Sequence, residues 1–418
     1  MISLEQKILA CTACLNDGPS QRERLRRVMA QGVDADRLIE TAVKEGLAGL
    51  LYRSLMESGL GETLGKEHKA RLQSLYYQTA ALNLKLTNDL KTVLQVFTEE
   101  KIQVVLLQGF ALLQEIYDDP GLRPTTDIDL WVLEKDYPGA AKILTSLGYG
   151  RDPLYPALFS RGSTIFDLHT HLHGAERNQA LKALLAGSQD RAYGATRIME
   201  IEGQRVLCLN RADQVLYLIL HALKHYASRL IWLVDIKLLL DRWNPLDWEI
   251  LVRRAKEVGQ EKATAFIISL LMHLFDLQPV GAARELLERE RMNYLERKAL
   301  ARRLAGDSLP VWEPFLLVSS GRAWHTRLAV LLEGMFPRPG ILRQVFPESA
   351  EGRVWELYLK RVLQAVRILR VSRENARSGS AWPTSRVPGT GTPTGGDGWL
   401  RPANRRFPVK GEARYGNS

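Results

Sequence analysis

Residues 102–133 read IQVVLLQGFALLQEIYDDPGLRPTTDIDLWVL and predict the centre of the fold. The β-branched and aliphatic run at 102–107 is typical of a short buried strand, which ends before Gly109. Residues 110–119 have the apolar spacing of a helix, and a Pro-Gly pair ends it. Residues 127–133 alternate between polar and apolar side chains, as a strand does. A strand, a helix and a second strand are therefore expected here.

Helical periodicity flanks this unit on both sides. Residues 1–100 predict helices, including a long one from about Lys66 to Glu100. Residues 101–209 contain the unit above, a further strand candidate and a hairpin signal, and residues 210–371 return to helical spacing. The sequence thus predicts an α+β protein, with a small mixed-sheet core between two helical regions and a tail at 372–418.

The charge is unevenly distributed. The net charge is +10, and residues 372–418 contribute half of it, with eight basic against three acidic side chains. In the same tail, 13 of 47 residues are Gly or Pro, a composition typical of disorder. The rest of the chain is only mildly basic. The charge is therefore compatible with nucleic-acid binding but does not indicate it.

The chain has the features expected of a cytoplasmic protein. No apolar run approaches the roughly 18 residues of a transmembrane helix. The first residues, MISLEQK, place Glu5 where a secretory signal needs a basic segment followed by an apolar one. Only three cysteines occur, an odd number that argues against a disulfide framework.

Three aspartates carry the strongest chemical signal. Asp127 and Asp129 are two residues apart in the strand at 127–133, so their carboxylates project from one face. Asp167 lies on the next strand candidate, residues 163–172. An isolated Asp-x-Asp is more often a solvated surface pair, but here it lies inside an apolar strand. Carboxylates in this arrangement can hold Mg²⁺, alone or as a metal pair, for phosphoryl or nucleotidyl transfer.

Three segments together resemble a known family. They are VVLLQGFALLQEIYDDPGLRPTTDIDLWV (104–132), IFDLHTHL (165–172) and LILHALKHYASRLIWLVDIKLLL (218–240). They are similar to bacterial nucleotidyltransferases of the DNA polymerase β-like superfamily, and the similarity extends from about residue 30 to residue 275. The resemblance implies a nucleotidyltransferase core in the α+β unit. It also implies a Mg²⁺-dependent enzyme that moves a nucleoside monophosphate from an NTP to a hydroxyl acceptor.

The resemblance also implies roles for individual residues. Asp127 and Asp129 match the metal ligands of the family, and Asp167 matches the third carboxylate, which activates the attacking hydroxyl. Gly109 matches the glycine of the first turn, where the missing Cβ lets the backbone approach a triphosphate. Arg123 matches a family arginine, for which bidentate phosphate binding and a structural ion pair with a nearby aspartate are both open.

The first turn departs from the family pattern. The family has Lys-Gly where this sequence has Gln108-Gly109, and Phe110 replaces a second small residue. A lysine neutralises phosphate charge, whereas glutamine only forms hydrogen bonds. Gln108 is therefore expected to contact nucleotide less strongly. The alternative function is a nucleotide-binding or scaffold protein on the same fold that has lost efficient catalysis.

Histidines accompany the last strand. His169 shares a face with Asp167 and is predicted to line the cofactor site, whereas His171 and His173 are expected to be polar residues at the strand end. A His-x-His strand also begins the metal site of amidohydrolase-like barrels. That alternative requires many later strand-helix units, and after His173 the sequence has one hairpin and then helices.

A second pair of histidines lies one helical turn apart, at His221 and His225. No glutamate follows His221, so this is not a zinc-protease signature. The default interpretation is a pair of core or helix-surface histidines. The resemblance in this segment, which includes Trp232 and Asp235, favours the alternative that these residues line the substrate cleft.

Overall fold

The computed structural model describes residues 2–13, 18–172, 178–307, 324–347 and 352–364. The chain divides into one unit at Met1–Glu333 and a second at Gly334–Ser418. The predicted tail, 372–418, lies outside the described residues. Among the helices that are described, none combines the length and the apolar character that a membrane crossing requires.

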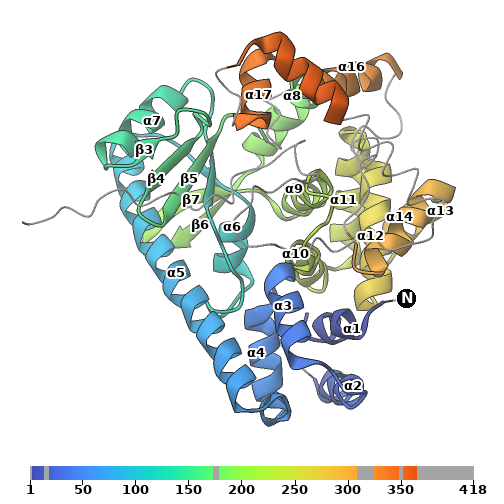
Figure 1. Ribbon diagram of the computed structural model, residues 1–418. Coiled ribbons are helices and arrows are strands. Elements are labelled where there is room, and N and C mark those ends of the chain that lie inside the picture. The colour runs from blue at the N-terminus through green and yellow to red at the C-terminus, as the bar shows by residue number, and fades with distance from the viewer. Residues whose placement is uncertain (1, 14–17, 173–177, 308–323, 348–351, 365–418) are drawn as a thin grey trace, which may run out of the picture. The chain divides into compact units, whose positions relative to one another are not determined.

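The N-terminal part of the first unit is helical (Figure 1). Its elements are α1 (Leu4–Cys11), α2 (Pro19–Met29), α3 (Ala35–Glu45), α4 (Ala48–Glu57), the 3₁₀ turn η1 (Gly61–Leu64) and the long α5 (Lys66–Glu99). Ser3 caps α1, since its hydroxyl accepts from the backbone N–H of Gln6 at 3.2 Å. The expected long helix is thus present almost residue for residue.

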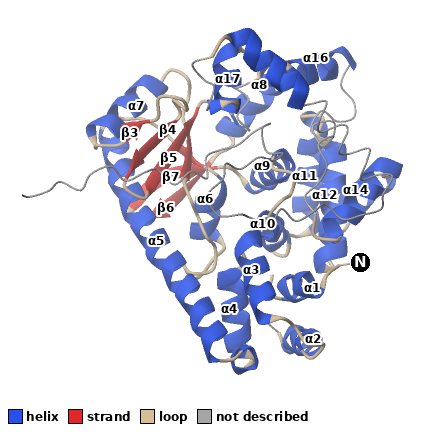
Figure 2. Cartoon of the chain, in the orientation of Figure 1, coloured by secondary structure: helices blue, strands red, loops and turns tan. Residues whose placement is uncertain are grey.

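A seven-stranded mixed sheet follows (Figure 2). Its strands are β1 (Val105–Leu106), β2 (Ile128–Trp131), β3 (Gly150–Arg151), β4 (Leu158–Arg161), β5 (Thr164–His169), β6 (Arg197–Ile201) and β7 (Gln204–Cys208). Their order is β3-β4-β5-β2-β1-β7-β6. The pairs β2–β5 and β1–β7 are parallel, and the other pairs are antiparallel. The predicted α+β class is confirmed.

Helices connect these strands and continue after them. They are α6 (Gln108–Glu115), α7 (Tyr137–Ser146), α8 (Gln179–Gly194), α9 (Arg211–Lys224), α10 (Leu230–Leu240), α11 (Pro245–Glu257), α12 (Glu261–Phe275), α13 (Ala282–Arg289), α14 (Tyr294–Leu304) and α16 (Trp324–Met335). The sequence did not predict β3, β4 or α8. The strands β3 and β4 have only two and four residues, and both residues of β3 are exposed. Neither strand therefore has an apolar pattern long enough to predict it.

The second unit is described only in part. It contains α17 (Pro339–Val345) and a helical segment at 354–364. Arg361 is almost fully buried, and its guanidinium donates to the carbonyl of Gly334 at 3.0 Å. Tyr358 donates to the carbonyl of Pro337 at 2.8 Å.

The two faces of the sheet have different neighbours. Ile128 and Leu130 point into the large apolar core, which includes side chains of α5 such as Leu90 and Phe97. Trp131 points the other way and packs in a smaller cluster with Tyr217 of α9. Because side chains alternate along a strand, Asp129 shares the face of Trp131. The side chain of Asp129 therefore lies on the face of the sheet opposite the core that contains α5.

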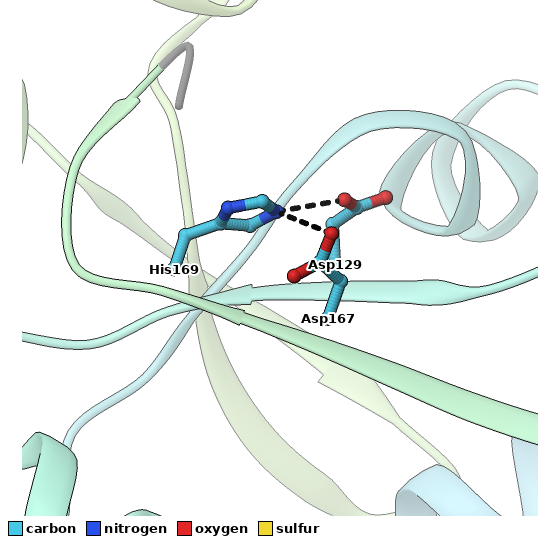
Figure 3. Close-up of side chains that lie close together, drawn as sticks. All are labelled: Asp129, Asp167 and His169. Carbon is cyan, nitrogen blue, oxygen red and sulfur yellow. Dashed lines mark hydrogen bonds and ion pairs between the residues drawn. The ribbon is translucent and has the colours of Figure 1, made fainter. Parts of the chain in front are cut away.

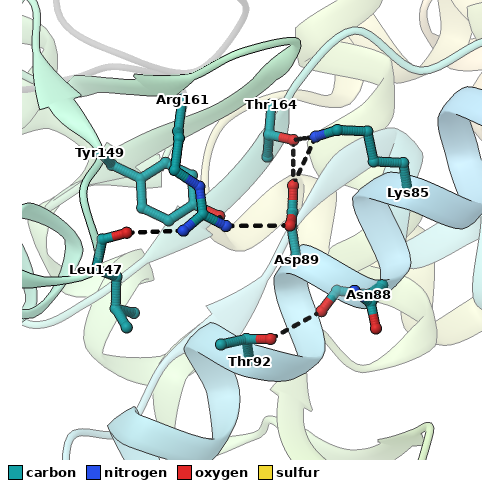
Figure 4. A network of polar contacts seen from close by, with 8 residues as sticks. All are labelled: Lys85, Asn88, Asp89, Thr92, Leu147, Tyr149, Arg161 and Thr164. Atoms are coloured by element: carbon teal, nitrogen blue, oxygen red, sulfur yellow. Dashed lines mark hydrogen bonds and ion pairs between the residues drawn. The ribbon is translucent and has the colours of Figure 1, made fainter.

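Asp89 joins α5 to the sheet (Figure 4). Its carboxylate accepts from Lys85 Nζ at 2.8 Å, from Arg161 Nη2 at 3.2 Å and from the hydroxyl of Thr164. The Arg161 guanidinium also lies 4.5 Å from the ring centroid of Tyr149. Burial by itself would raise the pKa of Asp89, but the hydrogen bonds from Lys85 and Thr164 hold it below its ordinary value. This network fixes the long helix against β4 and β5.

We expect Asp89→Asn to lower the free energy of unfolding by about 1–3 kcal/mol at pH 7, because it removes a charged acceptor from three donors. The wild-type advantage should disappear as the pH falls through the lowered pKa of Asp89, since protonation then removes the same charge. Urea unfolding at pH 7 and at pH 3 measures both effects. Asn88→Ala, on the exposed side of the same turn, is the control and should change little. Equal losses at the two pH values would contradict this account.

Candidate active site

The parallel pairing of β2 with β5 brings two carboxylates together. Asp129 lies directly opposite Asp167 in this register. His169, two residues further along β5, points toward both (Figure 3). Its Nε2 is 3.0 Å from Asp129 Oδ1 and 3.4 Å from Asp167 Oδ2. One ligand atom from each of the three residues lies within 4.8 Å of the others.

This cluster has the donors that a divalent cation needs. Asp129 is only 8% exposed, and the side chains of Asp167 and His169 are 14% and 13% exposed. Two like charges held so close in a largely buried place repel each other, and a cation between them relieves the repulsion. Carboxylate oxygens and an imidazole nitrogen are all established ligands of divalent metals. The residues present therefore fit a metal ion.

Asp127 lies beside this cluster rather than within it. Its carboxylate accepts from the hydroxyl of Thr126 at 2.9 Å. Burial, and then repulsion from Asp129 and Asp167, raises the pKa of Asp127 to about 7. The three predicted carboxylates thus share one electrostatic environment. The expected role of Asp127 as a metal ligand stays a prediction.

Gln108 contacts a carboxylate of the site. It begins α6 directly after β1 with a φ of 51°, a left-handed conformation that is uncommon for a residue with a Cβ. Its side-chain Nε2 donates to Asp129 Oδ1 at 2.9 Å, the same oxygen that His169 contacts. The strained turn thus holds an amide against Asp129. The expected contact of Gln108 with nucleotide stays a prediction.

Arg123 forms a buried ion pair. Its Nη2 is 2.8 Å from Asp235 Oδ2 and its Nε is 3.0 Å from Asp235 Oδ1, while Tyr117 donates to Asp235 Oδ1 at 2.7 Å. Burial by itself would lower the pKa of Arg123, but Asp235 raises it. The structural ion pair left open by the sequence is present, although its partner comes from α10 rather than from the neighbouring aspartates. Phosphate binding by Arg123 stays a prediction.

The glycine of the first turn leaves room for this arginine. A Cβ built on Gly109 would lie 2.1 Å from Arg123 Nη1. The sequence assigned the space beside Gly109 to a triphosphate, whereas the structure fills it with a guanidinium. No local signal pointed to this contact, because it depends on Asp235 holding Arg123 from 112 residues away. The approach of a triphosphate to this turn stays a prediction.

The second histidine pair belongs to a cluster of rings on α9 and α10. The rings of His221 and His225 have centroids 4.6 Å apart, and Trp232 lies 5.4 Å from the first and 5.3 Å from the second. Burial, and to a lesser extent Lys224, lowers the pKa of His225 to about 3. His225 is therefore neutral and packed, as the default interpretation expected. A role of this cluster in lining a cleft stays a prediction.

Comparison with known proteins identifies the family. Residues 31–276 match the family described as uncharacterised nucleotidyltransferase, and this range is more than half of the 418-residue chain. The chain therefore belongs to this family, which confirms the resemblance and the predicted class of enzyme. Membership implies an NTP as substrate, and enzymes of this class generally use divalent metals. Neither the curated proteins nor the solved structures gave a match.

The barrel alternative is wrong. The sheet is open, with β3 and β6 at its edges, and it does not close on itself within the described residues. His169 contacts aspartates of the site, whereas His171 Nε2 is 3.3 Å from Glu134 Oε1. His173 lies outside the described residues. The His-x-His pattern therefore does not begin an amidohydrolase-like metal site.

We expect the metal-free protein to lose stability as the pH rises. Asp127 keeps its proton in the folded chain up to about pH 7, but an unfolded aspartic acid loses it near pH 4. The folded state thus binds more protons between these values, so the free energy of unfolding falls as the pH rises through them. Melting temperatures of chelator-treated protein from pH 4 to pH 8 measure this. Asp127→Asn should flatten the dependence and stabilise the protein at pH 8.

The matched control for this measurement is Asp190→Asn, since Asp190 is exposed on α8. It should keep the wild-type pH dependence. A wild-type dependence in Asp127→Asn would mean that Asp127 does not carry the extra proton.

We expect Gly109→Ala to lower the free energy of unfolding by about 2 kcal/mol or more, because the new methyl group collides with a guanidinium that Asp235 holds in place. Chemical denaturation measures the loss. Gly194→Ala is the control, because a Cβ on that helical glycine meets nothing within 4 Å. If the two variants were equally stable, the close approach of Arg123 to Gly109 would be disproved.

Proposed function

We propose that the protein is a Mg²⁺-dependent nucleotidyltransferase that moves a nucleoside monophosphate from an NTP to a hydroxyl acceptor. The observation that carries this proposal is the pairing of Asp129 with Asp167 on adjacent parallel strands, in a chain of a nucleotidyltransferase family. Paired carboxylates on neighbouring strands can hold a cation against the phosphates of a bound nucleotide.

Each carboxylate has a part in this reaction. Asp129 and Asp167 would hold the cation, with Asp127 beside them as a further ligand. The cation, when bound, would supply positive charge to the phosphates and to the leaving pyrophosphate. Asp167 would accept the proton of the acceptor hydroxyl. The oxygen of that hydroxyl would bond to the α-phosphorus of the NTP as the bond from the α-phosphorus to pyrophosphate breaks. Gln108 orients the carboxylate of Asp129.

The residues proposed to contact the nucleotide are Gln108 and Gly109 of the first turn, Arg123, and His169 on β5. The family pattern implies Gly109 and Arg123, whereas His169 is proposed because it shares a strand face with Asp167. Two observations favour the alternative of a nucleotide-binding or scaffold protein with weakened catalysis. Gln108 carries no charge, and the guanidinium of Arg123 is engaged with Asp235. Neither side chain therefore neutralises phosphate charge in the way a free lysine does.

The acceptor is proposed only by its chemistry, as a molecule that offers a hydroxyl group. Nucleic acid is one such molecule, but the mild charge of the chain outside its tail does not single it out. A bacterial cytoplasm is the proposed setting. The chain has three cysteines, an odd and small number that supports a reducing compartment.

Asparagine variants of the three aspartates test the proposal. Asp127→Asn, Asp129→Asn and Asp167→Asn each remove a ligand charge at nearly constant shape. We expect pyrophosphate release to fall by about 100-fold or more in each, while the melting temperature is kept or raised because repulsion is relieved. Titration with ATP, GTP, CTP and UTP, with and without Mg²⁺, and a screen for pyrophosphate release over many hydroxyl acceptors provide the measurements.

Asp190→Asn is again the control and should behave as the wild type. An unchanged Mg²⁺ dependence in Asp129→Asn or Asp167→Asn would refute the assignment of the site. Nucleotide binding without turnover over the whole acceptor set would favour the weakened or scaffold function.

A further inference from the structure

We propose that His169 Nε2 is a direct metal ligand, and that with Asp129 and Asp167 it forms a mixed nitrogen and oxygen site that prefers a divalent transition metal ion, of the kind of Mn²⁺ or Co²⁺, over Mg²⁺. This inference rests on the proposed function only in placing the metal at the same carboxylates. The three-carboxylate site expected from the sequence contains oxygen ligands alone, so the imidazole changes the relative affinities for the ions, and Mg²⁺ remains the ion of the proposed reaction.

The distances fit a shared metal ion. With bonds of about 2.1 Å, neighbouring ligand atoms lie about 3.0 Å apart in an octahedral site and about 3.4 Å apart in a tetrahedral site. His169 Nε2 is 3.0 Å from Asp129 Oδ1 and 3.4 Å from Asp167 Oδ2. Both distances from His169 Nε2 are therefore those of ligands on one ion, and the three ligand atoms all lie within 4.8 Å of one another.

The backbone keeps the imidazole in this position. Asp167 and His169 are two residues apart on β5, so both side chains lie on the face that Asp129 shares. In the register of the sheet, His169 pairs with Trp131, which is 1% exposed. A rigid, largely buried strand thus presents the nitrogen, and binding does not require a flexible side chain to become ordered.

The same nitrogen already faces both carboxylates. His169 Nε2 lies against one oxygen of Asp129 and one of Asp167 (Figure 3). A metal ion bound here would use the lone pair of this nitrogen. The hydrogen bond from Gln108 to Asp129 Oδ1 remains as an outer contact that orients the carboxylate.

The chemistry of the donors determines the preference. Mg²⁺ is a hard ion that favours oxygen and keeps its waters, whereas imidazole suits first-row transition metals. For a site of given donors, affinity rises from Mn²⁺ through Co²⁺ along the first row. An all-oxygen site also holds Mn²⁺, so the distinguishing quantity is how much of the preference for transition metals depends on His169.

Pulsed electron paramagnetic resonance of Mn²⁺ bound to the full-length protein tests the ligand directly. We expect a ¹⁴N coupling typical of a bound imidazole in the wild type, and its loss in His169→Gln. The matched control is His171→Gln, because His171 is a buried histidine just beyond the same strand that pairs with Glu134. It should keep the coupling.

Calorimetry with Co²⁺, Mn²⁺ and Mg²⁺ tests the selectivity. We expect His169→Gln to weaken Co²⁺ and Mn²⁺ binding by about ten-fold or more and Mg²⁺ binding by less than about three-fold, so that the preference of the wild type collapses. His171→Gln should leave all three affinities near the wild-type values. Circular dichroism and melting curves of the variants check that each is folded.

The outcomes separate this inference from the proposed function. Mn²⁺ that binds without a nitrogen coupling, and is lost in Asp129→Asn, would overturn the role of His169 while leaving the carboxylate site intact. Equal losses of Mg²⁺ and Co²⁺ affinity in His169→Gln would overturn the selectivity. A nitrogen-coupled Mn²⁺ site in a protein that releases no pyrophosphate would support the inference and count against nucleotidyl transfer.

Discussion

The parallel pairing of β2 with β5 places the carboxylates of Asp129 and Asp167 side by side in a largely buried position. Like charges at this separation raise the free energy of the folded chain unless positive charge or hydrogen-bond donors surround them. Gln108 Nε2 is one such donor, and it reaches the same oxygen of Asp129 that His169 Nε2 contacts. The pairing of the two strands fixes the positions of these carboxylates. With His169 beside them, their arrangement fits a cation.

Two polar networks brace the sheet that carries the pair. On the α5 side, the carboxylate of Asp89 accepts hydrogen bonds from Lys85, Arg161 and Thr164. These bonds join the long helix to β4 and β5. Elsewhere, Asp235 of α10 holds Arg123, which lies between α6 and β2, against Gly109 near the start of α6. The Arg123–Asp235 pair is buried, and a buried ion pair adds little net stability, but breaking it leaves an uncompensated charge, so it strongly defines position. The site is therefore positioned by contacts between segments distant in sequence.

The same arrangement bears on chemistry. Gln108 donates to Asp129 and Arg123 pairs with Asp235, so a nucleotide at the proposed site would find hydrogen-bonding groups there but little positive charge from these two side chains. In the proposed reaction, the neutralisation of phosphate would then depend on the metal ion, and the identity of that ion would depend on the ligands around it. An imidazole between two carboxylates gives the site a donor that the family resemblance alone did not assign to it. The rate of the proposed reaction would therefore depend on which metal ion the site binds.

The sequence by itself determined the α+β class and the long helix at Lys66–Glu99, because these follow from local periodicity. The common face of Asp127 and Asp129 stays a prediction, since β2 begins at Ile128. Tertiary structure decided the neighbours. The register that sets Asp129 against Asp167, and the pairing of Arg123 with Asp235, join segments far apart in sequence, so no local pattern encodes them. The position of His169 depends on both local and tertiary structure. Its spacing from Asp167 predicted that the two side chains share a face of the strand, because side-chain direction is set locally. Only the pairing of β5 with β2 brought its Nε2 close to Asp129, because contact between strands is not encoded locally.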